Sequence, residues 1–369
     1  MKLSTSLTDL HTQLQSAARV ASTRLVNPVL SGVQISAGSA GTELRATDTD
    51  LSLRVPLAAD VQREGTVVLP ARLLLDVIKS LPKQADSVTL ELRPEHQDVE
   101  IHAGAAIFHL RTLRAEDFPP LPDPGSDGAV TVPAAPFLET IQRVSRSASR
   151  DETRPVLTGV LVSVTGEVLR MVATDSYRLS IKETPLGVAV DGFEANVPAR
   201  ALDELRALAG DGTDTISVAV HGNQIIFSVA DAVLSSRLID GQFPNFQQLL
   251  PDTFEHELRI DADEFREVVR RVGLLAQKNA PLRLSFTEGQ LTVSAQTPDI
   301  GEASEPLPVP FHGESFDIGF NPEFLREGLE AIGDDELVLK MLSPLRPGLL
   351  AGPEGSGFQY LIMPIRLNV

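Results

Sequence analysis

The sequence predicts an α+β chain built from three tandem copies of one unit, each with two helices packed on antiparallel sheet. Two kinds of observation support this. The stretch ATDTDLSL, Ala46 to Leu53, has a near twin 127 residues later in ATDSYRLS, Ala173 to Ser180. Other pairs keep the same order and nearly the same offset: NPVLSG and RPVLTG are 127 residues apart, LPARLLLDVIKSL and VPARALDELRALA 128, and EDFPPLP and GQFPNFQQLLP 125. Self-similarity at a constant period indicates repeated structural units.

A third, fainter copy follows the first two. APLRLSF (Ala280 to Phe286) stands where the RPVLTG segment should return, and FNPEFLREGLEAI (Phe320 to Ile332) resembles the two Pro-Ala-Arg segments. A third of the 369 residues is enough for each copy to bury a core of its own. We expect domains at residues 1–126, 127–253 and 254–369.

Each copy is expected to open with a strand and a helix. In the second copy, TVPAAPFLETIQRVSRSASR follows a turn-rich linker at residues 119–128. Phe137, Ile141, Val144 and Ala148 recur at helical spacing and form one apolar stripe. The stripes expected in the other copies are Leu7, Leu10, Leu14 and Ala21, and Phe265, Val268, Val269 and Val272.

The opposite faces of these three helices are basic. Residues 4–24 carry a net charge of +1, and residues 136–150 and 264–279 carry +2 each, which leaves −23 for the rest of a chain of net charge −18. One basic helical face is ordinarily just solvated. The same asymmetry in three equivalent helices favours an anionic partner such as nucleic acid.

Alternating segments such as GVLVSV, VLRMVAT and RLSIKET follow the first helix and predict antiparallel strands. The Pro-Ala-Arg segment begins a second helix, with proline near its first turn. A hairpin with an HGN turn (residues 221–223) closes the copy.

The composition gives little sign of an enzyme. With no cysteine, the chain can form neither disulfides nor a thiolate zinc site. The sequence contains no P-loop, no G-x-G-x-x-G and no G-x-S-x-G, and we expect no cofactor. The first 15 residues lack the apolar core of a signal peptide, and no run approaches the roughly 18 apolar residues of a spanning helix. A cytoplasmic protein is expected.

The ordered segments RLVNPVLSG, ATDTDLSL, FHLRTLRAEDFP, MVATDSYRLSI, DGQFPNFQQLLP, IGFNPEFLREGL and MPIRL together resemble the bacterial DNA sliding clamps, the β subunits of DNA polymerase III. The resemblance runs along the whole chain. It implies a homodimer whose two chains close head to tail into a ring around double-stranded DNA. It also implies a non-catalytic processivity factor that tethers the replicative polymerase, the clamp loader and other proteins carrying a clamp-binding motif, without recognising DNA sequence and without a membrane.

The resemblance also implies three sets of site residues. The peptide-binding pocket between the second and third copies would include Arg154, Leu157, Thr174, Tyr177, Arg178, Leu179, Pro244, Leu249, Asn321, Phe324, Leu361, Met363, Pro364, Ile365 and Arg366. The DNA-facing residues would be Arg19, Arg143, Arg146, Arg150, Arg266, Arg270, Arg271 and Lys278, with Arg24, Arg72, Arg154 and Arg200 as weaker candidates. The dimer interface would include Phe108, Leu110, Leu274 and Leu275.

The chain departs from the family pattern in the pocket. Ser176-Tyr177 stands where many members have Gly-His, and Gln248 stands where some have Arg. Two further residues, Asn368 and Val369, follow the usual terminal Leu. The first Ala-Thr-Asp corner, with Thr49-Asp50 at the matching positions, is expected to make no pocket.

Two other functions compete with a clamp. Asp48, Asp50 and Asp175 could be ligands of a divalent metal in a hydrolase, although the third copy offers no aligned Ala-Thr-Asp. Alternatively, Asp48 and Asp175 hold structural turns by accepting backbone N–H bonds. A repeat scaffold without nucleic acid is the second alternative, and the three basic faces argue against it.

Overall fold

A computed structural model describes residues 1–22, 27–82, 84–122, 128–210, 212–277 and 280–367. Its contacts divide the chain into two compact units. The first comprises Met1–Ala135 and Arg200–Leu238, and the second comprises Pro136–Ala199 and Ile239–Val369.

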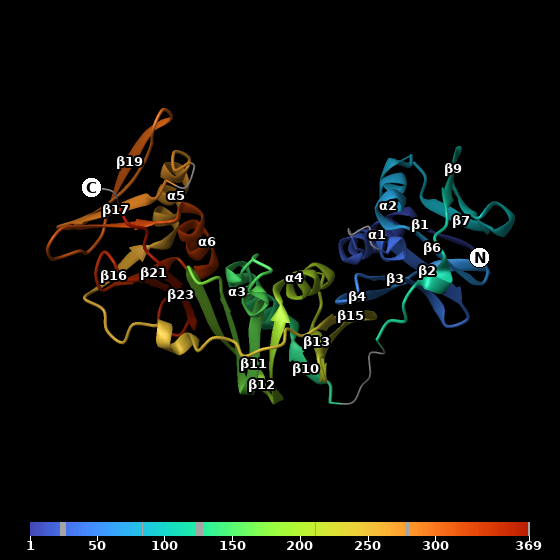
Figure 1. The fold of residues 1–369 in the computed structure, drawn as a ribbon, viewed down its shortest axis with the longest axis horizontal. Coiled ribbons are helices and arrows are strands. Elements are labelled where there is room, and N and C mark those ends of the chain that lie inside the picture. The colour runs from blue at the N-terminus through green and yellow to red at the C-terminus, as the bar shows by residue number, and fades with distance from the viewer. Residues whose placement is uncertain (23–26, 83, 123–127, 211, 278–279, 368–369) are drawn as a thin grey trace. The chain divides into compact units, whose positions relative to one another are not determined.

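The first compact unit contains two antiparallel sheets (Figure 1). One has the order β5-β1-β7-β8-β9, with β5 Ala59–Arg63, β1 Lys2–Ser6, β7 Ser87–Arg93, β8 Asp98–Ala103 and β9 Ala106–Arg111. The other has the order β10-β13-β14-β15-β4-β3-β2-β6, with β10 Val130–Pro133, β13 Thr215–His221, β14 Gln224–Val229, β15 Ala232–Arg237, β4 Leu51–Leu57, β3 Gly41–Thr47, β2 Gly32–Gly38 and β6 Gly65–Pro70.

The second compact unit is also built on two antiparallel sheets. One has the order β11-β12-β23-β22-β21-β16, with β11 Gly159–Thr174, β12 Arg178–Pro198, β23 Phe358–Ile362, β22 Gly348–Ala351, β21 Glu336–Met341 and β16 His256–Asp261. The other has the order β19-β18-β17-β20, with β19 Gly301–Pro308, β18 Gln290–Thr297, β17 Leu282–Thr287 and β20 Phe316–Phe320.

Six α-helices accompany the described strands: α1 Leu7–Val20, α2 Ala71–Ser80, α3 Ala134–Val144, α4 Ala199–Leu208, α5 Ala262–Gly273 and α6 Pro322–Ile332. Short 3-10 helices occupy Pro28–Ser31 (η1), Pro94–His96 (η2), Ala115–Asp117 (η3), Ser145–Ser147 (η4), Pro155–Thr158 (η5) and Phe246–Leu249 (η6). The helices α1 and α2 pack on each other, as do α5 and α6 (Figure 1).

Most residues of the apolar stripes predicted for the first helices lie in the cores, but Leu7 and Ala148 are half-buried, and Ala148 lies beyond α3, which ends at Val144. Leu10, Leu14 and Ala17 of α1 are fully buried, and the Ser6 hydroxyl caps this helix by accepting the N–H of Asp9 at 3.3 Å. In the second compact unit, the predicted α5 stripe at Phe265, Val268, Val269 and Val272 belongs to one cluster with the strands of both sheets.

The strand order confirms the three copies. The orders β1-β7-β8-β9, β10-β13-β14-β15 and β16-β21-β22-β23 follow one pattern, and β6-β2-β3-β4 matches β20-β17-β18-β19. In the middle copy, two long strands, β11 and β12, replace the second group, with register shifts around Gly166. The chain is therefore three tandem α+β copies, as the sequence predicts.

Adjacent copies are joined by strand pairing. β15 of the second copy pairs with β4 of the first, and β23 of the third copy pairs with β12 of the second, both antiparallel. Each pairing fuses the sheets of two copies into one larger sheet. By the same equivalence, β9 corresponds to β15 and β23, and β19 corresponds to β4 and to the start of β12. Each of these two strands lies at the edge of its sheet.

Candidate peptide-binding site and basic helices

The first Ala-Thr-Asp corner joins β3 to β4 and is held by its own side chains. Asp48 Oδ1 accepts the N–H groups of Asp50 and Leu51 at 3.1 and 2.8 Å. The Thr47 hydroxyl donates to the carbonyl of Leu51 at 3.0 Å and accepts the N–H of Thr49 at 3.0 Å. Thr49 has a positive φ of 84°, which few residues other than glycine adopt.

The second corner joins β11 to β12 and repeats these bonds. Asp175 Oδ1 accepts the N–H groups of Tyr177 and Arg178 at 2.9 and 3.0 Å. The Thr174 hydroxyl donates to the carbonyl of Arg178 at 2.7 Å and accepts the N–H of Ser176 at 3.2 Å. Ser176 has a φ of 78°. Both aspartates therefore hold structural turns, the role that the sequence suggests for them.

Nothing at these corners resembles a metal centre. The second oxygen of Asp48 pairs with Arg200, and that of Asp175 pairs with Arg178 at 3.1 Å. Asp50 is paired with Arg237 at 3.4 Å. Across the described ranges, no three or more His, Cys, Asp or Glu side chains form a group that could hold a metal ion. In the part of the chain that the structure describes, Asp48, Asp50 and Asp175 thus form no site for a metal hydrolase.

Exposed apolar side chains gather around the second corner. Tyr177 is 61% exposed and Met363 is 43% exposed. The two residues are joined because the N–H of Met363 donates to the carbonyl of Tyr177 at 2.8 Å. Beneath them, Leu179 and Leu361 face each other across the β12–β23 pair and are buried. The corner thus offers an apolar surface with a packed floor.

The segment after β15 supplies another side of this surface. Phe243 belongs to the buried cluster that contains Leu179 and Leu361, and Phe246 and Leu250 pack against that cluster. Leu249 lies on the same 3-10 turn as Phe246 and is 48% exposed. An apolar partner could bury Leu249 together with Tyr177 and Met363.

A buried arginine lies behind the apolar surface. Arg178 is 8% exposed and is paired with Glu327 of α6 and with Asp175. Its Nη2 donates to the main-chain carbonyl of Arg146 at 2.6 Å. One guanidinium therefore connects the corner, the helix α6 and the turn after α3. Its partners satisfy the charge that burial would otherwise make costly.

Two aromatic residues complete this network. The guanidinium of Arg178 lies over the Phe324 ring at 4.3 Å from the centroid, a cation–π contact. The Tyr360 hydroxyl donates to the Phe324 carbonyl at 2.8 Å. Burial opposes the charge of Arg178, but Tyr360 and Glu327 outweigh it and raise the pKa of this guanidinium above its ordinary value. Burial also raises the pKa of the Tyr360 hydroxyl.

The other predicted pocket residues lie nearby in the second compact unit. Arg154 donates to the Ser176 hydroxyl at 3.0 Å. Asn321 caps α6 by accepting the N–H groups of Glu323 and Phe324 at 2.9 and 3.1 Å. The N–H of Ile365 donates to the carbonyl of Gly319 at 2.7 Å, which ties the chain end to β20. The remaining predicted members are Leu157, buried, Pro364, half-buried, and Pro244 and Arg366, exposed. Asn368 and Val369 lie outside the described residues.

The first corner has a different surface. The N–H of Arg237 donates to the carbonyl of Asp50 at 2.8 Å, the counterpart of the Met363–Tyr177 bond, and the two side chains form the ion pair already noted. Where no pocket was expected, the structure has a hollow of about 170 Å³, small and polar, lined by Thr47, Thr49, Asp50, Ser52, Pro119, Pro120, Pro122, Gln224, Ser235, Ser236 and Arg237.

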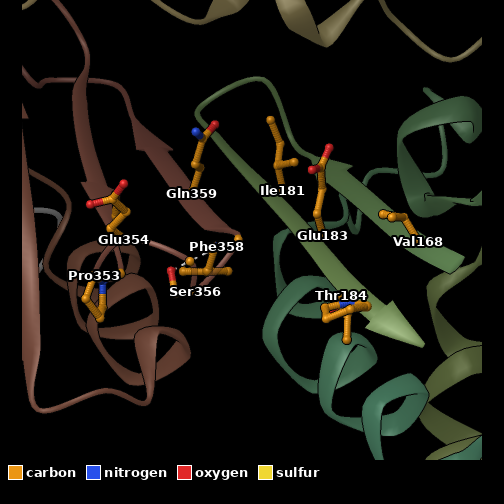
Figure 2. Close-up of a pocket in the computed structure, with 14 residues that line it drawn as sticks. Val168, Ile181, Glu183, Thr184, Pro353, Glu354, Ser356, Phe358 and Gln359 are labelled. Atoms are coloured by element: carbon orange, nitrogen blue, oxygen red, sulfur yellow. Dashed lines mark hydrogen bonds between the residues drawn. The ribbon is translucent and has the colours of Figure 1, made fainter. Parts of the chain in front are cut away.

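A larger hollow of about 540 Å³ lies on the same two strands as the second corner, between the Ile181–Pro185 part of β12 and the loop between β22 and β23 (Figure 2). Figure 2 shows Val168 and Glu183 on the β11–β12 side and Pro353, Glu354 and Ser356 on the side of the loop between β22 and β23. Glu183 is paired with Arg170 at 2.6 Å. The lining of this hollow mixes apolar and charged groups and does not favour one class of ligand.

The candidate DNA-facing arginines are mostly paired with carboxylates. In the first compact unit, Arg19 pairs with Glu204 at 2.7 Å, and Arg200 pairs with Asp48. Arg72 is exposed and has no ion pair with a described residue. Arg24 and Lys278 lie outside the described residues.

In the second compact unit, Arg143 departs from the sequence-based expectation. It is 16% exposed and its guanidinium donates to the carbonyl of Ile332 at the end of α6. Little of this side chain remains for a phosphate. Arg146 and Arg150 are exposed, and Arg146 pairs with Glu330 at 2.7 Å.

Three further candidates make local ion pairs on or beside α5. Arg266 pairs with Asp263, Arg270 with Glu267 at 2.7 Å, and Arg271 with Glu305 at 2.6 Å. The sequence-based prediction considered mainly the first helix of each copy. It therefore passed over the basic residues of the second helices: Lys79 of α2, Arg206 of α4 and Arg326 of α6. A sum of charge would have pointed only to the first of these helices, because LPARLLLDVIKSL carries +1, VPARALDELRALA 0 and FNPEFLREGLEAI −2.

The predicted interface residues differ in exposure. Leu274, just beyond α5, is 67% exposed, and Leu275 is half-buried against the core. On β9, Phe108 is half-buried and Leu110 is 6% exposed, so Leu110 serves mainly as core. Its neighbour Ile107, which the sequence-based prediction did not include, is 56% exposed.

Among the described helices, none has the length and apolarity that crossing a bilayer requires.

Three comparisons place the chain among known proteins. Family models for the N-terminal, central and C-terminal domains of the DNA polymerase III beta subunit match residues 1–122, 131–245 and 247–366. The chain is 33% identical to the beta sliding clamp of Synechococcus elongatus, with all of both chains covered.

Solved structures agree with the sequence comparisons. A DNA polymerase sliding clamp from Bacillus subtilis superposes with a TM-score of 0.90 at 27% identity, with both chains fully covered. A Pseudomonas aeruginosa sliding clamp bound to griselimycin superposes with a TM-score of 0.87 at 28% identity, again over both whole chains. The chain belongs to the family of DNA polymerase III beta subunits, the sliding clamps, which are non-catalytic processivity factors.

Proposed function

We propose that two of these chains close head to tail into a ring that encircles double-stranded DNA, slides along it, and tethers the replicative polymerase. The clamp loader and other proteins with a clamp-binding motif would use the same peptide site. The copies would divide at residues 1–126, 127–253 and 254–369, and the protein would act in the cytoplasm.

The pair of edge strands β9 and β19 supports ring closure most directly. Their counterparts already pair within the chain, as β15 with β4 and β23 with β12. An edge strand offers unpaired N–H and C=O groups to another chain. Pairing β9 of one chain with β19 of a second would repeat the same junction, and a head-to-tail contact stays finite when its rotation closes.

Side chains near these edges fit such a junction. Ile107, Leu274 and Ile300 are exposed apolar residues on or beside β9, α5 and β19. Arg111 ends β9, whereas β19 carries Glu302 and Glu305, so the two edges are complementary in charge. Phe108 and Leu275, both half-buried, would lie at the margin of the same contact.

The basic helices support a sequence-independent grip on DNA. Arginines on helices contact phosphates without distinguishing bases, and such binding weakens as salt rises. The ring, more than the affinity of its contacts, would keep the clamp on DNA.

The apolar surface around Tyr177, Leu249 and Met363 supports peptide binding. An apolar surface with a packed floor and arginines nearby suits a short motif with aliphatic anchors and an acidic group. Loss of one such anchor typically costs about 2 kcal/mol, or roughly thirtyfold in dissociation constant. Because the chain end is tied to β20, Met363→Ala tests the site better than a truncation would.

Retention on DNA tests the ring. Subunits would be dissociated and reassembled in the presence of nicked circular plasmid, and bound protein would be separated from free protein by gel filtration. A topological ring stays with the circle and is lost after a single restriction cut. Equal retention on both forms would contradict topological binding, and retention on neither would favour a scaffold without DNA.

Fluorescence anisotropy with a labelled clamp-motif peptide of the replicative polymerase tests the peptide site. Met363→Ala and Tyr177→Ala should weaken the peptide by about the factor given above, while Asp50→Ala at the first corner should not. Undiminished affinity in the first two variants would mean that peptides bind elsewhere.

A further inference from the structure

We propose that carboxylates beside the DNA-facing arginines compete with phosphates, keep each contact weak, and so allow the clamp to slide. This inference rests on the proposed encirclement of DNA. Of the ten candidate arginines in the described ranges, eight form an ion pair with an Asp or Glu: Arg19, Arg143, Arg146, Arg154, Arg200, Arg266, Arg270 and Arg271.

Glu330 shows how the competition works. One of its oxygens accepts from Arg146 and the other accepts from Arg326, each at 2.7 Å. If a phosphate takes Arg146, Glu330 keeps Arg326 as a partner and is not left unpaired. The exchange between carboxylate and phosphate is therefore nearly balanced. The arginine can release a phosphate as easily as it binds one.

A similar arrangement occurs on α5. Glu267 contacts both Arg270 and Arg271, at 2.7 and 3.4 Å, and Arg271 also contacts Glu305. In the first compact unit, Glu204 holds Arg19 at 2.7 Å and its side chain is only 14% exposed. Each compact unit thus has a carboxylate paired with a candidate DNA-facing arginine, and in the second unit Glu330 and Glu267 each contact a second arginine as well.

The physical reason is that tight contacts with phosphates would slow the sliding of the ring along DNA. A ring held by topology needs no tight phosphate contacts, and each tight contact would have to break at every step along the duplex. An exposed ion pair is weak, so it lowers phosphate affinity without preventing contact. The negative charge of the carboxylate also repels the backbone over about one Debye length, roughly 8–10 Å at moderate salt.

Charge-neutral variants test the competition. Glu330→Gln and Glu204→Gln keep the side-chain length but remove the charge. Each should raise affinity for a labelled duplex roughly two- to fivefold, and the double variant should approach the product. Each should also steepen the fall of the logarithm of the DNA-binding constant with the logarithm of salt concentration. The slope should change by less than about 0.9 for each additional phosphate that the protein neutralises.

Glu183→Gln is the matched control. Glu183 pairs with Arg170, and their side chains are 47% and 41% exposed, similar to the Glu330–Arg146 pair at 33% and 46%. The Glu183→Gln substitution therefore makes the same change in net charge at a site away from the candidate DNA-facing arginines. If the loss of the Glu330 charge acts through Arg146, adding Arg146→Ala to Glu330→Gln should abolish the increase in DNA affinity. A parallel double-mutant cycle with Arg326→Ala would show whether Arg326 contributes to the same increase.

Two outcomes would separate this inference from the proposed function. If wild type is retained on circles and lost from linear DNA, but Glu330→Gln and Glu204→Gln bind duplex no better than Glu183→Gln, the competition is wrong and the ring stands. If no variant distinguishes circular from linear DNA, the proposed encirclement itself fails. Thermal melting of each variant would verify that the fold is intact.

Discussion

At the scale of single residues, the two Ala-Thr-Asp corners show one turn used for two purposes. Both aspartates accept two backbone N–H groups. What differs is the neighbour: Asp50 with Arg237 at the first corner, Tyr177 with Met363 at the second. A charged pair closes one corner, and two exposed apolar side chains leave the other ready for a ligand.

The turn bonds make the two aspartates important for stability. Asp48→Ala and Asp175→Ala should each lower the free energy of unfolding by about 1 kcal/mol, because two backbone donors, one exposed and one partly buried, lose their acceptor. Asp175→Ala should cost more, since Arg178 also loses a partner. Asn at either position keeps the Oδ1 acceptor and should be milder. Urea unfolding measures each value, and an Asn variant as damaging as Ala would contradict this account.

Acid sensitivity should depend on Asp98. The hydrogen bond from Arg93, at 2.9 Å, holds the pKa of this buried carboxyl below its ordinary value. A carboxyl whose pKa is lower in the folded state stabilises the fold above its unfolded pKa, near 4, and loses that contribution as pH falls through the folded pKa. Asp98→Asn should therefore destabilise at neutral pH, and the difference from wild type should shrink below about pH 4. Thermal melting between pH 7 and 3 would show this, with the exposed Asp191→Asn as control. A constant difference across that range would contradict it.

At the scale of elements, α6 connects packing to function. Gly328 lets the helix approach β23, because a Cβ there would lie 2.5 Å from the Tyr360 ring. Glu327 holds Arg178, Phe324 lies under its guanidinium, and Glu330 pairs with Arg146. The position of this one helix therefore affects both the apolar surface and a candidate DNA contact.

The start of α6 should be sensitive to its cap. Asn321→Ala removes the acceptor for two backbone N–H groups and should lower the free energy of unfolding by about 1 kcal/mol. Asn321→Asp keeps the cap and should be close to wild type. Peptide affinity should follow the same order, because Phe324 lies in the first turn. Loss of affinity in both variants, with stability lost only in the first, would instead indicate direct contact between Asn321 and the peptide.

At the scale of the whole molecule, the pairing of copies explains why the chain has two fused sheets and why β9 and β19, unlike their counterparts in the other copies, are edge strands. Strand pairing joins the first copy to the second and the second to the third. The remaining edges, β9 and β19, have no further copy to pair with in the same chain. A second chain would supply it.

Leu274 tests this junction with little risk to the fold. Its side chain is 67% exposed, so Leu274→Asp should leave each chain folded and shift the mass from dimer to monomer, because a charge would be buried in the proposed contact. Leu274→Ala with Leu275→Ala should have the same effect, although Leu275 also packs on the core. Leu345, 69% exposed on a loop, is the matched control. Light scattering that reports a dimer for Leu274→Asp would exclude this residue from the interface.

The sequence by itself determined the copy number, the helices with their buried stripes, and the role of the repeated aspartates. These follow from short-range rules: a constant offset reveals duplication, helical periodicity marks the buried face, and an Asp two or three residues before free N–H groups forms a turn. The pocket residues came from the resemblance to the clamp family, and Tyr177, Leu249 and Met363 among them are exposed in the structure.

Only the tertiary structure decided how the charges are used. Arg143 lies on the polar face of its helix by periodicity, yet the end of α6 covers it, since residue 332 is far away in sequence and near in space. For the same reason the sequence could not show that Glu330 and Glu204 pair with Arg146 and Arg19. Periodicity tells which face is polar, but long-range packing determines which polar groups meet.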